Sequence, residues 1–371
     1  MAILLLLMLA IIGGGAYYLS KRFSQFFPIL SFKKWLLIFL CTTIAFVAGS
    51  LVFADSASLA GGILFYPGTI WVSILLYLLI SLLVVDLINL VIKIRPLIRG
   101  VIVLSITSII VIYGFINASV IRVNEVTIPV SGLKEDITAV QITDVHLGNF
   151  WGKENLKEIV NKVNECNPDV VLNTGDFFET AEFFTEDSDA LEPLKQIKVP
   201  HYFVHGNHDG YVGVEEAVKY MSSMGVIVLR NEVANFGELQ IVGLDNMQED
   251  ENENNAHTAG PGTVKDIMNQ LPIDEERPTI VLHHRPSGVS YMNEKKADVL
   301  LSGHTHGGQL FPMALIQEFT QPFNKGLHKF EDMSVYVSQG VGSLFPYIRV
   351  GTHSEITLIK FVPESASHTE E

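Results

Sequence analysis

Aspartate, asparagine and histidine side chains that could hold metal ions follow five apolar segments in the C-terminal two thirds of the chain. Each segment has the length and composition of a buried strand. The residues that follow are Asp144-Val145-His146, Gly175-Asp176, Gly206-Asn207-His208-Asp209, His283-His284 and Gly303-His304-Thr305-His306. Carboxylate, imidazole and amide groups are common protein ligands of hard and borderline divalent cations. The pattern therefore predicts that five strand ends meet in one metal site.

The motifs contain enough ligands for two ions, since two of the aspartates, the asparagine and four of the histidines would suffice. A carboxylate has two oxygens, so Asp176 can bridge both ions. Two ions about 3.5–4 Å apart hold the attacking and leaving oxygens of an in-line displacement at phosphorus, and they lower the pKa of a bound water. The predicted chemistry is hydrolysis of a phosphate ester.

Each motif taken alone also fits a structural role. An Asp-x-His after a strand is a common turn and helix cap, a Gly-Asp pair is a turn dipeptide, and His283-His284 could be two edge histidines. The motifs that begin at Gly206 and Gly303 are less ordinary. Because all five occur in one chain, each directly after an apolar strand, a shared site is favoured over five separate structural features.

These motifs lie in a part of the chain where strand and helix patterns alternate, between about residues 120 and 361. Residues 154–166 show the apolar spacing of a helix that stops before Asn167-Pro168, and residues 169–174 form a strand of the buried type. Such alternation predicts an α/β layered fold with mostly parallel strands. Ligands of these sheets bind beyond the carboxyl ends of the strands, where every motif is expected to lie.

Together, the five motifs resemble those of the calcineurin-like metallophosphoesterase superfamily, and the resemblance covers about residues 136–361. It extends to further segments that look like the bacterial branch whose members are membrane-attached or exported: residues 303–309, 326–328, 337–342 and 354–356. The resemblance implies an α/β layered metallophosphoesterase domain of two packed mixed β-sheets flanked by helices. It also implies two divalent metal ions, with manganese, iron and zinc as candidates.

The resemblance implies a role for each residue of the motifs. The first metal would be held by Asp144, His146, Asp176 and His306. The second metal would be held by Asp176, Asn207, His284 and His304. His208 would protonate the leaving alkoxide or help to hold the phosphate, and Asp209 would orient its imidazole.

Residues beside the motifs add three expectations. His284 is preferred to His283 as the ligand, because the family's histidine usually stands two residues before a proline and Pro286 has that spacing from His284. His283 is then expected to point to the opposite face or to cap the pocket. Arg285 is expected to bind the phosphate of the substrate, although a surface ion pair fits its position nearly as well. His205 stands where the family usually has an apolar residue or proline, which leaves the ligands intact.

The first third of the chain has a different composition. Residues 1–119 contain seven of the 25 Lys and Arg residues, two of the 40 Asp and Glu residues and none of the 12 histidines, which leaves 18 basic and 38 acidic residues in the remainder. An acidic soluble part argues against nucleic acid as the partner, because a phosphate backbone requires a basic surface. No obligate protein partner is evident. Cys166 is the only cysteine after residue 119, so no disulfide is expected there.

Four apolar stretches predict a membrane anchor of four transmembrane helices, at about residues 3–19, 35–54, 69–92 and 97–117. The first and third connecting loops carry four and three basic residues, and the second carries none. The positive-inside tendency then makes the first and third loops cytoplasmic. The chain is therefore predicted to be a multi-pass cell membrane protein whose catalytic domain, residues 120–361, is extracytoplasmic.

Three other features have simpler interpretations. Asp86 is the one acid within a predicted span, where a charge costs about 2.5–3.5 kcal/mol on insertion scales. Pairing with Lys93 or Arg95 is favoured over a functional role. Residues 247–262 are expected to be a flexible surface insertion, and residues 362–371 a disordered tail.

The sequence favours a membrane-anchored two-metal phosphoesterase that hydrolyses phosphate mono- or diesters, with lipid and nucleotide esters as candidate substrates. One alternative is a lipid pyrophosphate hydrolase of the UDP-diacylglucosamine type. Those enzymes work on the cytoplasmic side, so the predicted orientation argues against it. A second alternative is a non-catalytic scaffold that keeps the fold, which the complete ligand set disfavours. A third is a transporter or channel, which the scarcity of polar residues in the spans disfavours.

Overall fold

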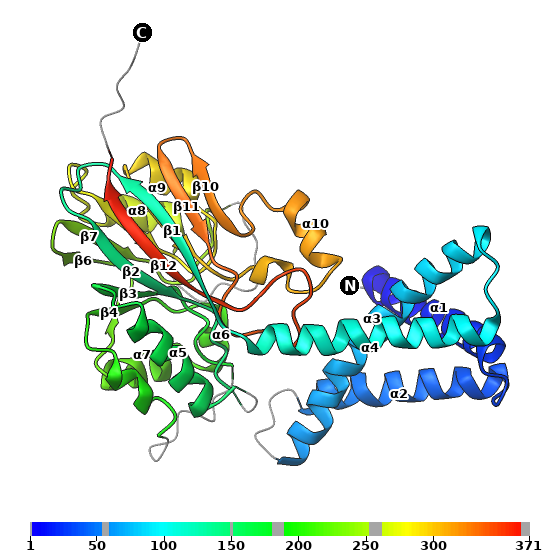
Figure 1. Ribbon diagram of the computed structural model, residues 1–371. Helices are drawn as coiled ribbons and strands as arrows, with labels where there is room; N and C mark the ends of the chain where they lie inside the picture. The colour runs from blue at the N-terminus through cyan, green and yellow to red at the C-terminus, as the bar shows by residue number, and fades with distance from the viewer. Residues whose placement is uncertain (1, 54–58, 149–150, 180–188, 252–261, 365–371) are drawn as a thin grey trace, which may run out of the picture. The chain divides into compact units, whose positions relative to one another are not determined.

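The computed structural model describes residues 2–53, 59–148, 151–179, 189–251 and 262–364 (Figure 1). The chain divides into two units, which we call the helical unit and the α/β unit. The helical unit contains residues 1–117 and 345–350, and the α/β unit contains residues 118–344 and 351–371. The division lies two residues from the predicted boundary. The assignment of residues 345–350 to the helical unit was not predicted.

The described part of the helical unit has four helices: α1 (Ala2–Phe26), α2 (Phe32–Phe53), α3 (Leu59–Val91) and α4 (Pro96–Ser119). Three stretches are long and apolar enough to cross a membrane, namely Phe32–Gly49, Pro67–Val91 and Pro96–Ser119. Only the backbone of residues 2–12 is described, so a crossing by α1 stays a prediction.

Apolar and aromatic side chains pack the helical unit. Phe23 of α1 lies against Trp35 and Phe39 of α2, with ring centroids 5.3 Å away in each case and edge-to-face geometry. Leu82 of α3 and Val103 of α4 belong to the same buried cluster. Large side chains on successive turns therefore hold the four helices together.

Asp86 of α3 forms ion pairs with two arginines, so the prediction that it pairs with Lys93 or Arg95 is wrong. Its Oδ2 lies 2.7 Å from Nε of Arg22 on α1, and its Oδ1 lies 3.3 Å from Nη1 of Arg99 on α4. The hydroxyl of Tyr18 donates a 2.6 Å hydrogen bond to the same carboxylate. Lys93 instead donates to backbone carbonyls of its own helix. Tertiary packing of α1 and α4 thus decides the partner.

The α/β unit contains two mixed sheets, as predicted, each with six described strands. The first sheet has the order β1 (Arg122–Val130), β12 (Glu355–Pro363), β2 (Ile137–Ile142), β3 (Val170–Asn173), β4 (His201–Phe203), β5 (Ile227–Val228). Its strands are parallel except where β12 meets β2. Because β12 continues to Pro363, the predicted tail begins later than residue 362, and residues 365–371 lie outside the described part.

The second sheet has the order β10 (Gly326–Phe330), β11 (Met333–Val337), β9 (Val299–Ser302), β8 (Thr279–Leu282), β7 (Leu239–Gly243), β6 (Glu232–Phe236). The pairs at its two edges are antiparallel and the inner pairs are parallel. The inner strands are fully buried and apolar, which is typical of parallel strands covered on both faces.

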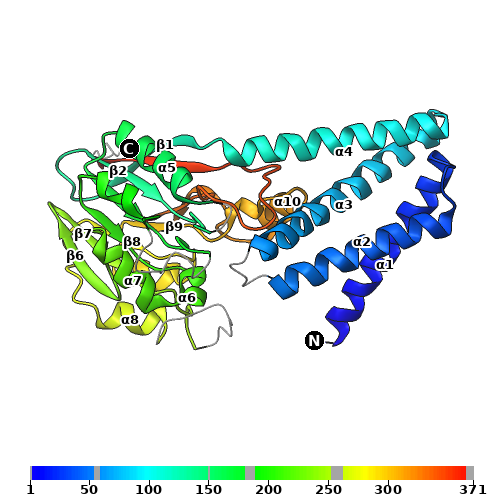
Figure 2. The same cartoon turned by 90° about the horizontal axis from the view of Figure 1, so that it is seen from below.

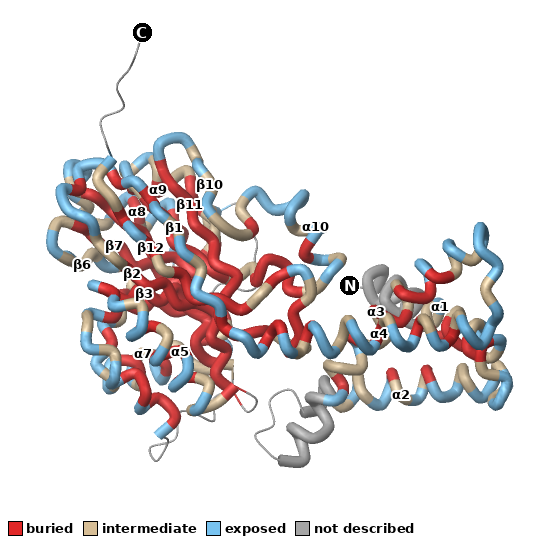
Figure 3. Tube along the Cα trace, viewed as in Figure 1, coloured by how far each residue is buried: buried red, intermediate tan, exposed pale blue. Residues whose placement is uncertain are grey.

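The main core lies between the two sheets. Leu172 and Ile359 of the first sheet and Ile280 and Leu301 of the second belong to one buried cluster. Figure 3 shows the buried residues concentrated in these central strands. A second cluster lies between the second sheet and two helices, α8 (Val264–Gln270) and α9 (Val289–Glu294). The unit is therefore layered, with two sheets in the middle.

Helices flank the sheets, with α5 and α7 on one side and α8 and α9 on the other in Figure 1, and Figure 2 shows the same elements from below. The helix predicted over residues 154–166 is α5 (Lys153–Glu165), whose apolar stripe from Leu156 to Val163 is buried. The others are α6 (Asn207–Val212), α7 (Val214–Ser223), α10 (Met313–Thr320), and the short 3-10 helices η2 (Glu192–Gln196) and η3 (His306–Gly308). Residues 252–261, most of the predicted insertion, lie outside the described part.

Candidate metal centre

The five motifs follow the carboxyl ends of five strands, as the sequence predicts. Strands β2, β3 and β4 are neighbours in the first sheet, and β8 and β9 are neighbours in the second. The backbone N–H of Asp144 bonds to Gly175 O, and that of Gly303 bonds to His284 O, so the loops beyond neighbouring strands stay paired. This arrangement brings the side chains of both sheets to one edge of the α/β unit.

Five residues of the motifs have a left-handed backbone. The φ values are 53° at Asp144, 51° at His146, 52° at Asp176, 74° at His304 and 49° at His306. This region is uncommon for residues with a side chain and costs roughly 1–3 kcal/mol at each position. Such outliers cluster where a side chain must be aimed, which is consistent with a site that holds ions.

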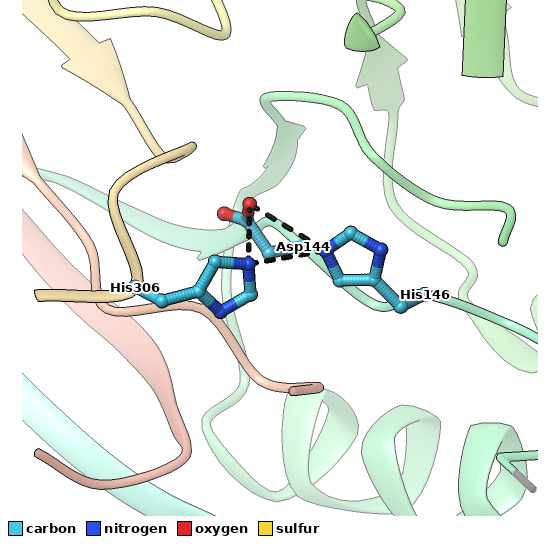
Figure 4. A group of neighbouring side chains, drawn as sticks. All are labelled: Asp144, His146 and His306. Atoms are coloured by element: carbon cyan, nitrogen blue, oxygen red, sulfur yellow. Dashed lines mark hydrogen bonds and ion pairs between the residues drawn. The ribbon is translucent and has the colours of Figure 1, made fainter. Parts of the chain in front are cut away.

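Asp144, His146 and His306 form the first group of possible ligands (Figure 4). The Nε2 atoms of the two histidines lie 3.1 Å apart, and Nε2 of His306 lies 3.3 Å from Oδ1 of Asp144. Figure 4 shows both imidazoles facing the carboxylate. The backbone N–H of His304 donates to both oxygens of Asp144 and fixes its orientation. Three donor atoms that face one another at this distance suit a cation between them.

Asp176, His284 and His304 form the second group. Nε2 of His284 lies 3.0 Å from Oδ2 of Asp176 and 3.3 Å from Nδ1 of His304. Nδ1 of His284 lies 2.8 Å from the carbonyl of Thr174, so it carries the proton in that hydrogen bond. The Nε2 atom, aimed at the other two ligands, is then the one available to a metal.

The charges in this group also fit a cation. Burial alone would lower the pKa of His284, but Asp176 and Asp144 raise it to about 9. Burial would raise the pKa of Asp176, but His284 holds it well below its usual range. A proton on His284 therefore occupies the position that a metal ion takes when it binds and displaces that proton.

Asp176 connects the two groups, and Asn207 is the remaining predicted ligand of the second ion. Oδ2 of Asp176 lies 4.0 Å from Nε2 of His146 in the first group and 3.0 Å from His284 in the second. Its Oδ1 accepts the backbone N–H of His208. The side-chain Oδ1 of Asn207 is buried and accepts no hydrogen bond from the described residues. A buried amide oxygen without a donor is costly unless a cation binds it, so the residues present fit the second ion.

Glu179 was not predicted as part of the site. Its Oε2 lies 2.7 Å from Nδ1 of His146 and 2.9 Å from Nδ1 of His208, on the side of each ring away from Nε2. Burial alone would raise the pKa of Glu179, but these histidines lower it to about 2. Burial would lower the pKa of His208, but Glu179 and Asp176 raise it to about 9. The signal in the sequence was an acid three residues beyond Asp176.

Asp209 has a different position from the one expected. Its Oδ1 accepts the backbone N–H groups of Phe177 and Phe178, and its Oδ2 accepts that of Gly206. The described contacts of its carboxylate are thus with backbone, and Glu179 occupies the place beside His208 that was assigned to Asp209. The bonds from Phe177 and Phe178 tie the loop after β3 to the loop after β4, and the bond from Gly206 lies within the loop after β4. Together they hold the loops that carry Asp176 and Asn207 in register.

The neighbours of the ligands have separate structural positions. His283 is fully buried, and burial with the nearby charges of Arg285 and His284 lowers its pKa to about 3, so it is neutral. Nε2 of His205 lies 3.1 Å from Oδ1 of Asp245, which follows β7, so it links the two sheets. Arg285 directly follows the ligand His284 and is 9% exposed. Its contact with substrate stays a prediction.

A glycine beyond β11 allows Asp144 its position. Gly340, in the predicted segment 337–342, has a φ of +78°, and a Cβ there would lie 2.6 Å from Cβ of Asp144. The backbone N–H of Val341 bonds to the carbonyl of Thr143, so this loop packs directly on the first motif. The glycine is therefore required by close approach as well as by its backbone angle.

Comparison with known proteins agrees with this geometry. Residues 137–308 match the family model of the calcineurin-like phosphoesterases. A transmembrane protein with metallophosphoesterase domain from Danio rerio is 34% identical over 279 residues, which are 70% of this chain and 62% of that protein. An uncharacterized metallophosphoesterase from Helicobacter pylori is 29% identical over 248 residues, 66% of this chain and 65% of that protein.

The phosphodiesterase YaeI of Escherichia coli is 28% identical over 232 residues, which are 60% of this chain and 80% of that protein. The chain spans slightly less than two thirds of the Danio rerio and Helicobacter pylori relatives. The residues matched by the family model, 137–308, include all five strand-end motifs and both ligand groups. With its two mixed sheets and its ligands at the strand ends, the α/β unit contains a calcineurin-like phosphoesterase domain, which the family model matches over residues 137–308.

Proposed function

We propose that the protein is a metal-dependent phosphoesterase that holds two divalent cations. The observation that carries this proposal is the position of Asp176 between two groups of ligands, with its Oδ2 atom 4.0 Å from His146 and 3.0 Å from His284. The first cation is held by Asp144, His146, Asp176 and His306, and the second by Asp176, Asn207, His284 and His304. Two bound cations supply Lewis acidity toward the phosphate and lower the pKa of a water beside it.

His208 is the general acid of this proposal. The carboxylate of Glu179 accepts a hydrogen bond from Nδ1 of His208 and favours the protonated ring. The other ring nitrogen then carries the proton that passes to the leaving alkoxide. Arg285, next to the ligand His284, orients the phosphate. Asp209 acts by holding the loops that carry Asp176 and Asn207.

A phosphate diester is the favoured substrate class over a monoester. The Escherichia coli relative is named as a phosphodiesterase, and its similarity to this chain covers 60% of the chain. Manganese, iron and zinc all accept the carboxylate, imidazole and amide ligands present here. The scaffold alternative is disfavoured, because it gives no reason for a buried asparagine oxygen that lacks a donor among the described residues.

The helical unit anchors the enzyme in the cell membrane with the α/β unit outside the cytoplasm. Three described stretches could cross a bilayer, and the Danio rerio relative is named as a transmembrane protein. Four basic residues lie near the facing ends of α1 and α2, and three lie in or next to the connection between α3 and α4. They support a cytoplasmic position for these two connections. A reporter fused after Glu371 should be active outside the cytoplasm, and activity inside would reverse the orientation.

The enzymatic proposal is tested on purified protein with a chromogenic phosphodiester. We expect hydrolysis that requires added divalent cation, and that is lost in Asp176→Ala together with bound metal measured by mass spectrometry. The matched control is Asp332→Ala, because Asp332 is exposed in the turn between β10 and β11. Equal hydrolysis and metal content in wild type and Asp176→Ala would refute the two-metal site.

A further inference from the structure

Exposed apolar side chains are concentrated in one short segment of the α/β unit. Among its described residues, ten large apolar side chains are exposed, and five of them lie between residues 311 and 319. These five, which we call the α10 face, are Phe311 (42% exposed), Met313 (49%), Leu315 (50%), Ile316 (46%) and Phe319 (82%). An exposed patch of this kind marks a surface that binds a partner or a membrane.

The way in which α10 packs explains why its large residues face outward. Ala314 is the one buried side chain of the helix, and it lies against Gly308. A Cβ at Gly308 would come within 2.6 Å of Cα of Ala314, so only the smallest residues fit at this contact. Met313, Ile316 and Phe319 are spaced at three-residue intervals and share one face. Figure 3 shows most of α10 as exposed.

The α10 face is directly connected to the metal centre. The 3-10 helix η3 begins with His306, a predicted ligand of the first metal, and its last residue is Gly308. The N–H of Leu310 bonds to the carbonyl of Gly308, and the N–H of Ala314 bonds to the carbonyl of Leu310. A short bonded chain of turns thus joins the ligand to α10, so a surface that binds α10 is held close to the ligand.

The same segment is bonded to the residues at which the chain passes into the helical unit. Gln309 donates to the carbonyl of Leu344, Leu310 pairs with Gly351, and Thr352 donates to the carbonyl of Gln309. Residues 345–350, between these partners, belong to the helical unit. The residues just before α10 are therefore bonded to the residues on both sides of segment 345–350, which belongs to the helical unit.

Within the helical unit, that segment is bound to the end of α4. The N–H of Arg349 donates to the carbonyl of Gly114 over 3.0 Å, and Asn117 donates to the carbonyl of Arg349 over 2.9 Å. The stretch Pro96–Ser119, which is α4, is apolar enough to cross a bilayer. Chain continuity thus links α10 to the final turns of a candidate membrane span.

We propose that the α10 face inserts into the interface of the bilayer that the helical unit crosses. A helix that lies in the bilayer interface buries an apolar face at the boundary between the headgroups and the acyl chains. Between residues 311 and 320 the only charged residue is Glu318, which lies 3.5 Å from Nζ of Lys325. The docked helix holds the metal centre at the membrane surface, so its substrates are phosphate esters of lipid headgroups. This statement about substrate rests on the proposed phosphoesterase function, whereas the docking does not.

The docking is tested with an environment-sensitive fluorophore on the full-length chain in proteoliposomes. Both natural cysteines are replaced (Cys41→Ser, Cys166→Ser), and the label is attached to Phe319→Cys or to the control Leu327→Cys. Leu327 is also an exposed apolar residue of the α/β unit, at 44%, but it lies on β10. Lipids that carry a quencher should quench the label at residue 319 at least threefold more than the label at 327.

The substrate class is tested with two esters that release the same chromophore, one soluble and one on a diacylglycerol phosphate within the vesicles. The double variant Ile316→Ser, Phe319→Ser should hydrolyse the lipid ester at least tenfold more slowly and the soluble ester at the wild-type rate. The control Leu327→Ser should leave both rates unchanged.

The outcomes separate the two proposals. Equal quenching at residues 319 and 327 overturns the docking, and dimerisation that depends on Phe319 would assign the face to a second copy instead. An unchanged lipid-ester rate in the double variant overturns the substrate class. If wild type hydrolyses neither ester, the phosphoesterase function fails, while the quenching still decides whether α10 meets the bilayer.

Discussion

Oε2 of Glu179 lies 2.9 Å from Nδ1 of His208, and the same oxygen contacts His146, a predicted metal ligand. One carboxylate therefore orients both a ligand and the proposed general acid. Such outer carboxylates fix the tautomer of a histidine and make its ring more basic. Glu179 therefore connects the proposed general acid, His208, with a predicted ligand of the first metal, His146.

Replacement of this carboxylate should slow hydrolysis and change its pH dependence. We expect Glu179→Gln to lower the rate roughly 10- to 100-fold. An acid must be protonated to act, so the rate falls as pH rises through the pKa of His208. Because Glu179 raises that pKa, its loss should move the alkaline fall in rate to lower pH. The pH profile of kcat/KM measures this shift, and Asp332→Asn should show the wild-type profile. If the alkaline fall in kcat/KM stayed at the wild-type pH, Glu179 would not be the residue that raises the pKa of His208.

The stability of the metal-free protein should also depend on this pair. Glu179 has a pKa lowered from 4.5 to about 2 in the fold, so its contribution is present above pH 4.5 and is lost as pH falls toward 2. His208 has a pKa raised from 6.5 to about 9, so its contribution is present below pH 6.5 and is lost as pH rises toward 9. The difference in melting temperature between wild type and Glu179→Gln should therefore be largest between about pH 4.5 and 6.5. A difference that is constant with pH would contradict the pairing.

Asp209 should behave differently from Glu179. Asp209→Ala leaves three backbone N–H groups without their acceptor, and each buried group left unsatisfied costs roughly 1–3 kcal/mol. We expect a fall of several kcal/mol in the free energy of unfolding, measured by denaturant titration, with loss of metal as the loops separate. The fraction that stays folded should keep the wild-type pH profile. A shifted profile in a stable variant would restore Asp209 as the orienter of His208.

Two glycines with similar backbone angles allow the effect of backbone strain to be distinguished from the effect of a steric clash with Asp144. Gly340 has a φ of +78° and lies against Asp144, whereas Gly326 has a φ of +83° and would meet nothing within 4 Å. An alanine at either position is destabilised by the positive φ, but only Gly340→Ala should displace Asp144, a predicted metal ligand. Calorimetric titration should show metal affinity at least about tenfold weaker in Gly340→Ala than in Gly326→Ala. Equal affinities would mean that the loop after β11 does not position the ligand.

The strand ends could be predicted from sequence because local patterns determine them. Buried parallel strands are short apolar runs, and the polar residue after such a run, as at Asp176 or His284, must leave the sheet at its carboxyl edge. The two mixed sheets of the α/β unit are confirmed. The number of membrane spans stays a prediction, since three of the four are supported by described side chains.

The incorrect predictions of side-chain partners have one cause: residues that are close in sequence need not be in contact in the fold. Asp209 adjoins His208 in sequence, yet its carboxylate binds the backbone of another loop, and Glu179 from that loop reaches His208. Asp86 is likewise paired with arginines of α1 and α4 rather than with Lys93 or Arg95, which are nearer to it in the chain. Side chains from separate elements meet only once the fold exists, so spacing alone could not identify them.

The left-handed backbone at Asp144, His146, Asp176, His304 and His306 bears on why these residue types stand at these positions. Glycine adopts this region freely, whereas a residue with a side chain bears an energetic cost there. Glycine at any of the five positions would relieve this backbone cost but would remove a side chain of the site. Backbone energy alone therefore gives no reason for these residues, whereas a role of their side chains in holding ions does.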